Sequence, residues 1–385
     1  MLTGYLPHSA ETVAGWLMKR EGLLNKKWSY DYGVVWRGME MLYALTGREV
    51  YFSYIHDALD SMVGEDGTIA GYDLSAQNLD YLCNGRNLIF LYEKTGKEKF
   101  RKAVALLRSQ LDTQPRTSDG GFWHKNVYPF QMWLDGQHMA IPFYIQAERM
   151  LHGETDALND AASQLIVAYR HTLNSETGLP CHGWDEKKQQ PWADPQTGRA
   201  AHAWGRAVGW YMVALADSLE LLPRENERYG EVLEIFQTLS QQLLSVRQEG
   251  IWLQVLDCPG RTGNYPESSG SCLMTYALLK GARLGLLPAQ CGQEAQRSFE
   301  SIQRHFVGQM KNGETFVAKC CQGAGLGGSG GRDGSFDYYI SENVVSRDLK
   351  ATGAFIQAAC EEQLLREGRK DDGGKSFGGP GAGLC

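Results

Sequence analysis

Hydrophobic residues recur every three or four positions along most of the chain, which is the spacing of one face of an α-helix. Residues 212–222 and 232–243 show this most clearly, with Met, Leu, Ala, Val, Ile and Phe three or four apart. The alternation of β-branched residues that marks a half-buried strand is scarce. The pattern therefore predicts an all-α protein.

One ten-residue segment occurs twice, 49 positions apart. Residues 42–51 read LYALTGREVY, and residues 91–100 read LYEKTGKEKF. In each copy we expect an apolar helix to end at the Thr-Gly turn and a second helix to begin at once, because glycine readily adopts the left-handed backbone that ends helices. Repeated helical hairpins predict either a solenoid or a closed ring of hairpins.

Long polar loops rich in Gly, Trp, His and Asp separate the helical stretches. Loops of this length in a compact domain are usually functional. Their near-regular spacing predicts that they meet on one face of a ring and form a single cleft. The five predicted loops are residues 64–78, 112–133, 174–203, 250–270 and 312–341.

Composition narrows the classes of partner. The 385 residues are 43% hydrophobic, enough for a sizeable core, and the net charge is −7. That charge argues against a nucleic-acid surface, and no apolar run approaches the length of a membrane span. We therefore expect neither nucleic acid nor a membrane as a partner.

The cysteines and the chain ends bear on location. Nine cysteines without CxxC pairs or metal-ligand spacing predict reduced thiols in a cytoplasmic protein, and no secretory signal is visible. The alternative is a secreted protein whose signal peptide has been removed. Residues 1–366 are expected to form one domain, and the Gly-rich residues 367–385 have the composition of disordered chain.

The segment Trp192–Trp210 is the richest in candidate binding residues, with three tryptophans, histidine and arginine. A bare indole face stacks on a sugar ring, and an arginine fork matches a carboxylate, so the segment predicts a pocket for an acidic sugar. Arg206 and Trp210 share a helix face; alternatively, Arg206 pairs with an acid of the protein and Trp210 belongs to the core. Gly205 and Gly209 each destabilise a helix by about 1 kcal/mol, which indicates close approach of a neighbouring helix or of the ligand.

Three other residues are candidates for chemistry. Asp135 has apolar and aromatic neighbours, so we expect burial to raise its pKa toward the range of a general acid; alternatively, it caps a helix. Asp80 would supply a second carboxylate for acid–base work on a sugar, or else cap a helix start. His182, between Cys181 and Gly183 in a long loop, is either a ligand donor or a solvated loop residue.

Several segments together resemble the unsaturated rhamnogalacturonyl hydrolases of glycoside hydrolase family 105. The resemblance extends over about residues 15–361. The segments that carry it are Asn78–Tyr81 with Asn84–Arg86, Trp133–Gly136, Trp192–Trp210, Tyr265–Gly270 and Arg332–Tyr339. It implies that residues 1–366 form an (α/α)6 toroid built from helical hairpins.

The resemblance also implies a reaction. Such enzymes remove a terminal 4,5-unsaturated uronic acid left by polysaccharide lyases, here unsaturated galacturonic acid linked to rhamnose in a small pectin-derived saccharide. It implies that Asp135 is the general acid/base and that Asp80 is its partner at the uronic-acid ring. The double bond already stores the activation, so neither a cofactor nor a metal is needed. The substrate-binding residues that it implies are His182, Trp204, Arg206 and Trp210.

Other interpretations stay open at this point. The unsaturated glucuronyl hydrolases that act on glycosaminoglycan fragments share the fold and the chemistry, although the form Trp-Gly-Arg-Ala-Val-Gly-Trp at 204–210 favours family 105. A sugar epimerase or a conventional inverting glycosidase on the same toroid is a second alternative. A non-catalytic helical-repeat binding protein is a third, against which the long loops argue.

Overall fold

The computed structural model describes residues 9–153, 156–328 and 330–368. Within them the chain forms thirteen α-helices and eight strands of two or three residues, so the predicted all-α fold is confirmed. The last helix, α13, ends at Arg366. The single-domain boundary at residue 366 stays a prediction, and of the predicted tail, residues 369–385 lie outside the described residues.

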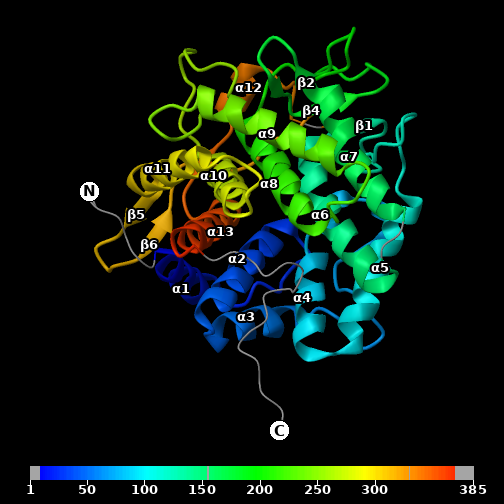
Figure 1. Ribbon diagram of the computed structural model, residues 1–385, viewed down its shortest axis with the longest axis vertical. Helices are drawn as coiled ribbons and strands as arrows, with labels where there is room; N and C mark the ends of the chain where they lie inside the picture. The colour runs from blue at the N-terminus through cyan, green and yellow to red at the C-terminus, as the bar shows by residue number, and fades with distance from the viewer. Residues whose placement is uncertain (1–8, 154–155, 329, 369–385) are drawn as a thin grey trace.

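Twelve of these helices form two concentric layers (Figure 1). The inner layer consists of α2 (Tyr30–Thr46), α4 (Gly85–Thr95), α6 (Leu134–Leu151), α8 (Gly205–Leu221), α10 (Ser268–Arg283) and α13 (Leu349–Arg366). The outer layer consists of α1 (Ser9–Glu21), α3 (Glu49–Asp60), α5 (Glu98–Thr113), α7 (Ala157–Thr172), α9 (Tyr229–Val246) and α11 (Ala289–Phe306). Neighbouring inner helices pack together all the way round, and α13 closes the ring against α2. The hairpins therefore form a closed (α/α)6 toroid and not a solenoid.

The repeated sequence segment forms the same turn in two hairpins. Gly47 ends α2 with φ 65° and Gly96 ends α4 with φ 66°, and each glycine N–H donates to the tyrosine carbonyl four residues earlier at 2.8 Å. The hydroxyls of Thr46 and Thr95 also bond to the preceding helical turn, at 2.6 and 2.7 Å. The next helix starts two residues after each glycine. The Thr-Gly prediction is confirmed in both copies.

Small residues set the contact between α8 and α10. A Cβ on Gly209 would lie 2.9 Å from Leu273 Cβ, and a Cβ on Gly270 would lie 2.8 Å from the backbone of Gly205. Real side chains do not pack this closely, so the two backbones approach at a distance that only glycine permits. The predicted close approach of a neighbouring helix is confirmed.

Short antiparallel strands organise the long loops. β1 (Gln131–Trp133) pairs with β4 (Gly183–Asp185), and β7 (Cys320–Cys321) pairs with β8 (Val344–Val345). The other two pairs are β2 (Leu173–Asn174) with β3 (Leu179–Pro180), and β5 (Val307–Gln309) with β6 (Thr315–Val317). β1, β2, β4 and α12 lie together at the top of Figure 1.

The predicted loop 312–341 is wrong at its C-terminal end. Residues Phe336–Ser341 form the helix α12, because the Ser335 hydroxyl accepts a hydrogen bond from Tyr338 N at 3.1 Å and so caps it. Two 3₁₀ turns, η1 (Leu74–Ala76) and η2 (Leu79–Leu82), lie between α3 and α4. A six-residue helix is too short for the hydrophobic periodicity to reveal it.

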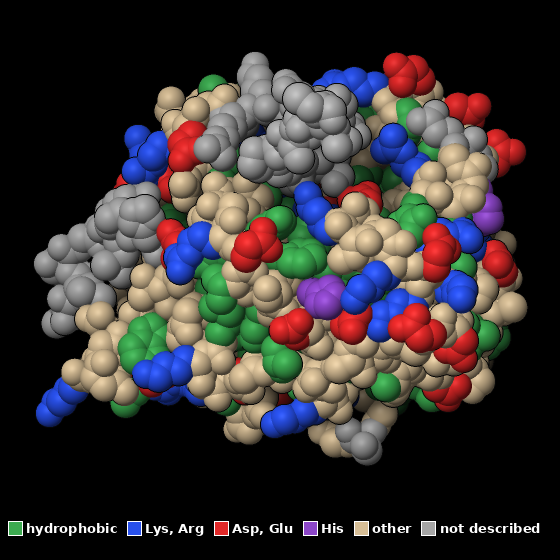
Figure 2. Space-filling view, turned by 90° about the horizontal axis from the view of Figure 1, so that it is seen from below, with side chains coloured by type: hydrophobic (Ala, Val, Ile, Leu, Met, Phe, Trp, Pro, Cys, Tyr) green, Lys and Arg blue, Asp and Glu red, His purple; other side chains and the backbone are tan. Residues whose placement is uncertain are grey.

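Charged groups occupy part of the ring's interior in pairs. Lys280 Nζ lies 2.6 Å from Asp217 Oδ1 and 2.5 Å from Glu220 Oε2, and Arg86 Nη1 lies 2.5 Å from Asp217 Oδ2. At the surface, Figure 2 shows side chains of both charges interspersed over the coloured part of the face seen from below. None of the described helices is both long and apolar enough to cross a bilayer.

The glycine contact between α8 and α10 gives a test of the packing. We expect Gly209→Ala to lower the free energy of unfolding by about 1–3 kcal/mol, because the added methyl group forces the two helices apart. The matched control is Gly15→Ala in α1, where a Cβ meets nothing within 4 Å. There alanine should stabilise by about 0.5–1 kcal/mol. Urea unfolding measures both; equal shifts in the two variants would contradict the close-contact argument.

Candidate active site

The β1–β4 pairing brings Asp135 to His182. Trp133 lies opposite Gly183 in the ladder, and Leu134 N–H donates to the carbonyl of His182 at 3.0 Å. Asp135 follows in the first turn of α6, whose N-cap is Trp133, so the interpretation of Asp135 as a helix cap is wrong. His182 Nε2 lies 3.2 Å from Asp135 Oδ2, in close electrostatic contact but without hydrogen-bond alignment.

His182 is fully buried, so the alternative of a solvated loop residue is wrong. Its Nδ1 lies 2.8 Å from the Tyr339 hydroxyl, and its ring centroid lies 4.7 Å from that of Trp204 and 5.5 Å from that of Trp133. Because Tyr339 engages one ring nitrogen, the other faces Asp135. The structure thus holds the imidazole in one orientation against the carboxylate.

The pKa of Asp135 differs from the sequence-based expectation. Burial alone raises this pKa. The contact with His182 and the more distant His124 and Arg206 lower it by more than burial raises it, so the pKa lies below the usual aspartate value. The predicted rise is therefore wrong for the protein without substrate. Oδ2, the oxygen that faces His182, is buried, whereas the side chain as a whole is 14% exposed, so a ligand can approach Asp135 from the side away from His182.

Asp80 lies in η2 and is held by a basic partner. The side chain of Asn78 caps this turn by accepting from Asp80 N at 3.0 Å, so Asp80 is not the cap. The Asp80 carboxylate lies 2.5 Å from Lys125 Nζ and 3.6 Å from His124 Nε2. Burial lowers the pKa of His124 to about 4, and Asp80 and Asp135 oppose this only in part. A neutral imidazole therefore interacts with both candidate carboxylates.

An aromatic stack adjoins Asp135. The ring of Trp133 lies between those of Tyr128 and His124, with centroid distances of 4.8 and 4.6 Å. A Cβ on Gly136 would lie 3.0 Å from His124 Nδ1, so the glycine after Asp135 leaves room for this stack. The stack forms one wall beside the carboxylate.

Arg206 is a buried cation in the first turn of α8, with 1% of its surface exposed. Its Nη1 donates to the Cys321 carbonyl at 2.6 Å and to Ser269 Oγ at 3.2 Å. Within the described residues no carboxylate lies within 4.0 Å of it, so the alternative that it pairs with an acid of the protein is wrong. Glu267 acts on this guanidinium from beyond Ser269, whose hydroxyl donates to the Glu267 carboxylate at 2.8 Å, so the charge has no direct carboxylate contact and can still receive an anionic ligand.

The tryptophans do not present bare faces. Trp192, Trp204 and Trp210 are 3%, 1% and 1% exposed. Trp204 is covered by His182, by the Arg206 guanidinium at 4.7 Å and by the Tyr339 ring, and its Nε1 donates to Gln254 Oε1 at 3.1 Å. The predicted exposed stacking surface is therefore wrong, because Trp204 and Trp210 lie at the start of an inner helix that neighbours cover and Trp192 packs in a separate buried cluster.

Trp210 is as buried as the alternative prediction, that it belongs to the core, requires. Its ring stacks on that of His138 with centroids 4.4 Å apart. Burial lowers the pKa of His138 to about 4, so the stacked imidazole is neutral at physiological pH. Direct contacts of Trp204 and Trp210 with substrate stay predictions. In the structure Trp204 packs against His182, and Trp210 packs against His138.

The candidate residues cluster at the amino-terminal ends of inner helices. Asp135 and Arg206 lie in the first turns of α6 and α8, Ser269 lies in the first turn of α10, and Asp80 precedes α4. Helix N-termini carry partial positive charge and favour anions. This end of the toroid therefore suits an acidic ligand.

Several neighbours of these residues are not predicted by the sequence. Lys125, Gln254 and Tyr339 hold Asp80, Trp204 and His182, as described above. Each lies in one of the predicted functional loops, so the loops indicated the regions. Nothing in the local sequence indicated which residue of one loop meets which residue of another.

A closed (α/α)6 toroid that holds an aspartate, an imidazole and an unpaired guanidinium at one end defines the protein as a candidate carbohydrate-active enzyme. The model of the family described as Glycosyl Hydrolase Family 88 matches residues 9–365 of this chain. A family 105 glycoside hydrolase from C. acetobutylicum ATCC 824 superimposes with a TM-score of 0.91 at 40% identity, over 93% of this chain and 100% of that one. The chain therefore belongs to the unsaturated glycuronyl hydrolases of families 88 and 105, and is a glycosidase.

The chain also matches two curated proteins. Protein Atu3128 of Agrobacterium fabrum is 37% identical over 237 residues, covering 59% of this chain and 99% of that protein. The unsaturated rhamnogalacturonyl hydrolase YesR of Bacillus subtilis is 26% identical over 275 residues, covering 70% of this chain and 75% of that protein. The family resemblance and the enzyme class predicted from the sequence are confirmed.

The His182–Asp135 contact predicts a titration shift. We expect His182→Gln to raise the pKa of Asp135, because it removes the nearest group that lowers this pKa and leaves the effect of burial in place. Carbon NMR of protein labelled at the aspartate carboxyls measures the titration, and Asp135→Asn identifies the signal. A pKa that is unchanged or lower in His182→Gln would contradict the electrostatic role of the imidazole.

Proposed function

We propose that the protein removes a terminal 4,5-unsaturated galacturonic acid from rhamnose by hydrating the C4=C5 double bond. The observation that carries this proposal is the reachable Asp135 carboxylate, held against His182 beside a buried guanidinium without a carboxylate partner. The name of the relative YesR and the 40% identity to a family 105 enzyme support the choice of substrate. Small unsaturated oligosaccharides are the substrates of this family of enzymes.

The proposed reaction uses Asp135 twice. First, the Asp135 carboxyl gives its proton to C4, and the ring oxygen stabilises the positive charge that develops at C5. A water molecule then adds to C5 and gives its proton back to Asp135. The product is a hemiketal at C5, which opens to a ketone as the bond from C5 to the ring oxygen breaks. The former ring oxygen is now a hydroxyl on C1, and this hemiacetal collapses to an aldehyde as the bond from C1 to the aglycone oxygen breaks and the aglycone leaves as an alcohol. The net change is addition of one water molecule, and Asp135 ends in its starting state.

The first step needs a protonated Asp135, and the charge of the substrate supplies a reason for one. Without substrate, Arg206 is among the groups that lower the pKa of Asp135. A bound uronate places a negative charge near this pair and offsets the positive charge of Arg206. Both effects raise the pKa of Asp135 when the substrate binds, so the acidic substrate promotes protonation of its own catalyst.

Asp80 and the aromatic stack are proposed to position the sugar. The Asp80 side chain, which contacts Lys125 and His124, is 16% exposed, so its carboxylate can accept hydrogen bonds from ring hydroxyls. His182 holds Asp135 in place. Trp204 and Trp210 hold His182 and the first turns of α8, which fixes the guanidinium of Arg206.

A cytoplasmic location is part of the same proposal. The eight cysteines in the described residues are free thiols, and seven of them are buried. Such a set of thiols is typical of a reducing compartment, where small unsaturated saccharides would arrive after import.

The reaction predicts a spectroscopic result. The conjugated C4=C5 bond absorbs in the ultraviolet, and hydration removes that absorbance. With unsaturated galacturonyl-rhamnose, Asp135→Asn should lower kcat by about 100- to 10,000-fold, because it removes the general acid/base. Asp112→Asn, at a carboxylate that is 64% exposed, is the matched control and should leave kcat unchanged.

Three substrates separate the possible outcomes of this assay. Turnover of unsaturated galacturonyl-rhamnose in preference to an unsaturated glucuronyl disaccharide supports the proposal. The reverse preference would support the hydration mechanism but identify unsaturated glucuronic acid as the sugar that is removed. Cleavage of a saturated galacturonide, or full activity in Asp135→Asn, would overturn the hydration mechanism.

Arg206 predicts a dependence on the substrate carboxylate. A hydrogen bond to a charged group contributes about 1.5–3 kcal/mol, so Arg206→Gln should lower kcat/KM for the free acid by roughly 10- to 150-fold. The methyl ester of the same substrate should be a poor substrate for the wild type and should lose little further in the variant. Arg206→Lys should retain part of the preference for the acid. An undiminished preference for the acid in Arg206→Gln, with an intact circular dichroism spectrum, would exclude Arg206 from carboxylate recognition.

A further inference from the structure

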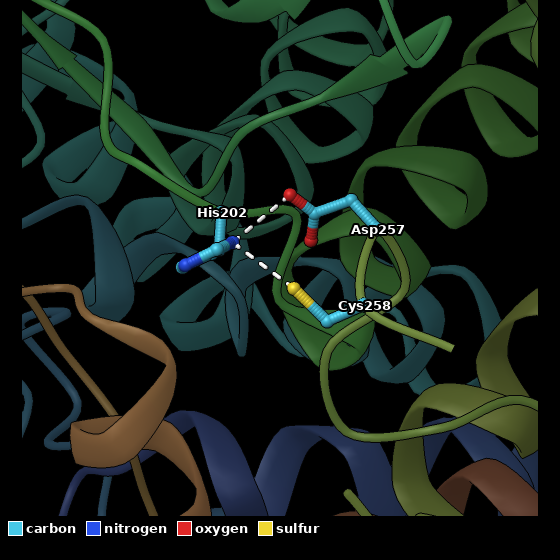
Figure 3. A group of neighbouring side chains, drawn as sticks. All are labelled: His202, Asp257 and Cys258. Atoms are coloured by element: carbon cyan, nitrogen blue, oxygen red, sulfur yellow. Dashed lines mark hydrogen bonds and ion pairs between the residues drawn. The ribbon is translucent and has the colours of Figure 1, made fainter. Parts of the chain in front are cut away.

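A histidine, an aspartate and a cysteine meet outside the catalytic group. His202 Nδ1 lies 3.0 Å from Asp257 Oδ2 and 3.6 Å from Cys258 Sγ, and the three donor atoms all lie within 4.8 Å of one another (Figure 3). Figure 3 shows both contacts reaching the same ring nitrogen, while the other nitrogen points away. The carboxylate and the thiol come from adjacent residues, and the imidazole comes from a separate loop.

The spacing fits a tetrahedral metal ion. With bonds of about 2.0 Å to nitrogen and oxygen and about 2.3 Å to sulfur, a tetrahedral zinc site places N and O about 3.3 Å apart and N and S about 3.5 Å apart. The observed distances are 3.0 and 3.6 Å. Both distances from Nδ1 therefore suit one ion, and the carboxylate and the thiol, which lie within 4.8 Å of each other, would move to about 3.5 Å on binding it.

Two acceptors, the Asp257 carboxylate and the Cys258 thiol, face the same ring nitrogen of His202. If Nδ1 of His202 carries a proton, it donates to Asp257, and Cys258 Sγ faces the same N–H as a weak acceptor. If Nδ1 is unprotonated, it can accept from the thiol, but its lone pair then faces the carboxylate of Asp257. A cation between the three donors interacts favourably with all of them.

We propose that His202, Asp257 and Cys258 form a site for Zn²⁺, with water as the fourth ligand. One nitrogen, one oxygen and one sulfur donor match a borderline-soft divalent transition metal and do not match Ca²⁺ or Mg²⁺, which take oxygen ligands. The three residues are partly exposed, so an ion has a path to them.

The site would tie two loops together behind the catalytic group. Asp257 Oδ1 already accepts from Ala203 N at 3.1 Å, Leu256 N–H donates to the Ala203 carbonyl at 2.9 Å, and the His202 carbonyl accepts from His182 N at 3.1 Å. The ion would thus join residues 202–203 to residues 256–258 next to His182. This is a structural role, and the hydration step does not depend on it.

The test uses metal binding and thermal stability, not activity. The full-length protein is stripped with a chelator and titrated with Zn²⁺ by calorimetry, and with Co²⁺ to detect the absorption bands of a thiolate-bound ion. We expect one equivalent of Zn²⁺ to bind and to raise Tm, as for any ligand that binds only the folded state. Mg²⁺ should do neither.

Three variants locate the site. Loss of an outer-sphere partner lowers metal affinity by about 10- to 100-fold, so loss of a ligand in Cys258→Ser or Asp257→Asn should lower it at least as much. The matched control is Cys291→Ser, at another free cysteine in α11, and it should bind like the wild type.

The metal-binding results test the zinc site independently of the proposed reaction. Zn²⁺ binding that weakens in Cys258→Ser and Asp257→Asn but not in Cys291→Ser supports the site. No binding at micromolar Zn²⁺, or equal binding in all four proteins, overturns it. Neither result depends on which saccharide the enzyme hydrolyses.

Discussion

Closure of the inner ring is the constraint on which the rest of the structure depends. The ring closes where α13 meets α2, and a Cβ on Gly353 would lie 2.8 Å from the backbone of Val34. Gln357 Nε2 adds a hydrogen bond of 2.8 Å to the Val34 carbonyl, across 323 residues of sequence. Asp135 and Arg206 lie on the neighbouring ring helices α6 and α8, which pack directly against each other, and the closed ring holds these helices in their places.

The toroid treats its buried charges in two different ways. In the interior, Asp217 receives Lys280, Arg86 and the Tyr276 hydroxyl, so its charge is compensated by direct contacts. At the amino-terminal ends of the inner helices, the Arg206 guanidinium has neutral partners. A buried pair maintains the fold, whereas Arg206 meets the nearby Glu267 only through Ser269 and has a direct place for an anion that a ligand would supply. The difference separates charges that stabilise the protein from charges that serve its proposed reaction.

The candidate site depends on contacts between loops as much as on the helices. His182 reaches Asp135 through the β1–β4 ladder, and Tyr339 of α12 holds the other side of its ring. The proposed zinc site lies one step further out, on the loop that bonds to the backbone of His182. The catalytic carboxylate is therefore oriented by residues from several loops, and any substitution that loosens one loop is transmitted to it.

The local structure follows from short stretches of the sequence. Helical periodicity, the two Thr-Gly turns and the glycine spacing of α8 predicted the helices, the hairpins and the close contact with α10, because these features depend on residues a few positions apart. The motifs around Asp135 and Arg206 also carried the family resemblance.

Tertiary structure alone decided the environment of each side chain. It lowered the pKa of Asp135, because the fold places His182, which is 47 positions away in sequence, against the carboxylate. The apolar sequence neighbours of Asp135 had suggested a raised pKa. It buried Trp204, because an inner helix is covered on all sides. It joined His202 to Asp257 and Cys258, because two loops fold against each other. Electrostatics and burial depend on what lies within a few ångströms in space, and the spacing of residues along a chain does not contain that information.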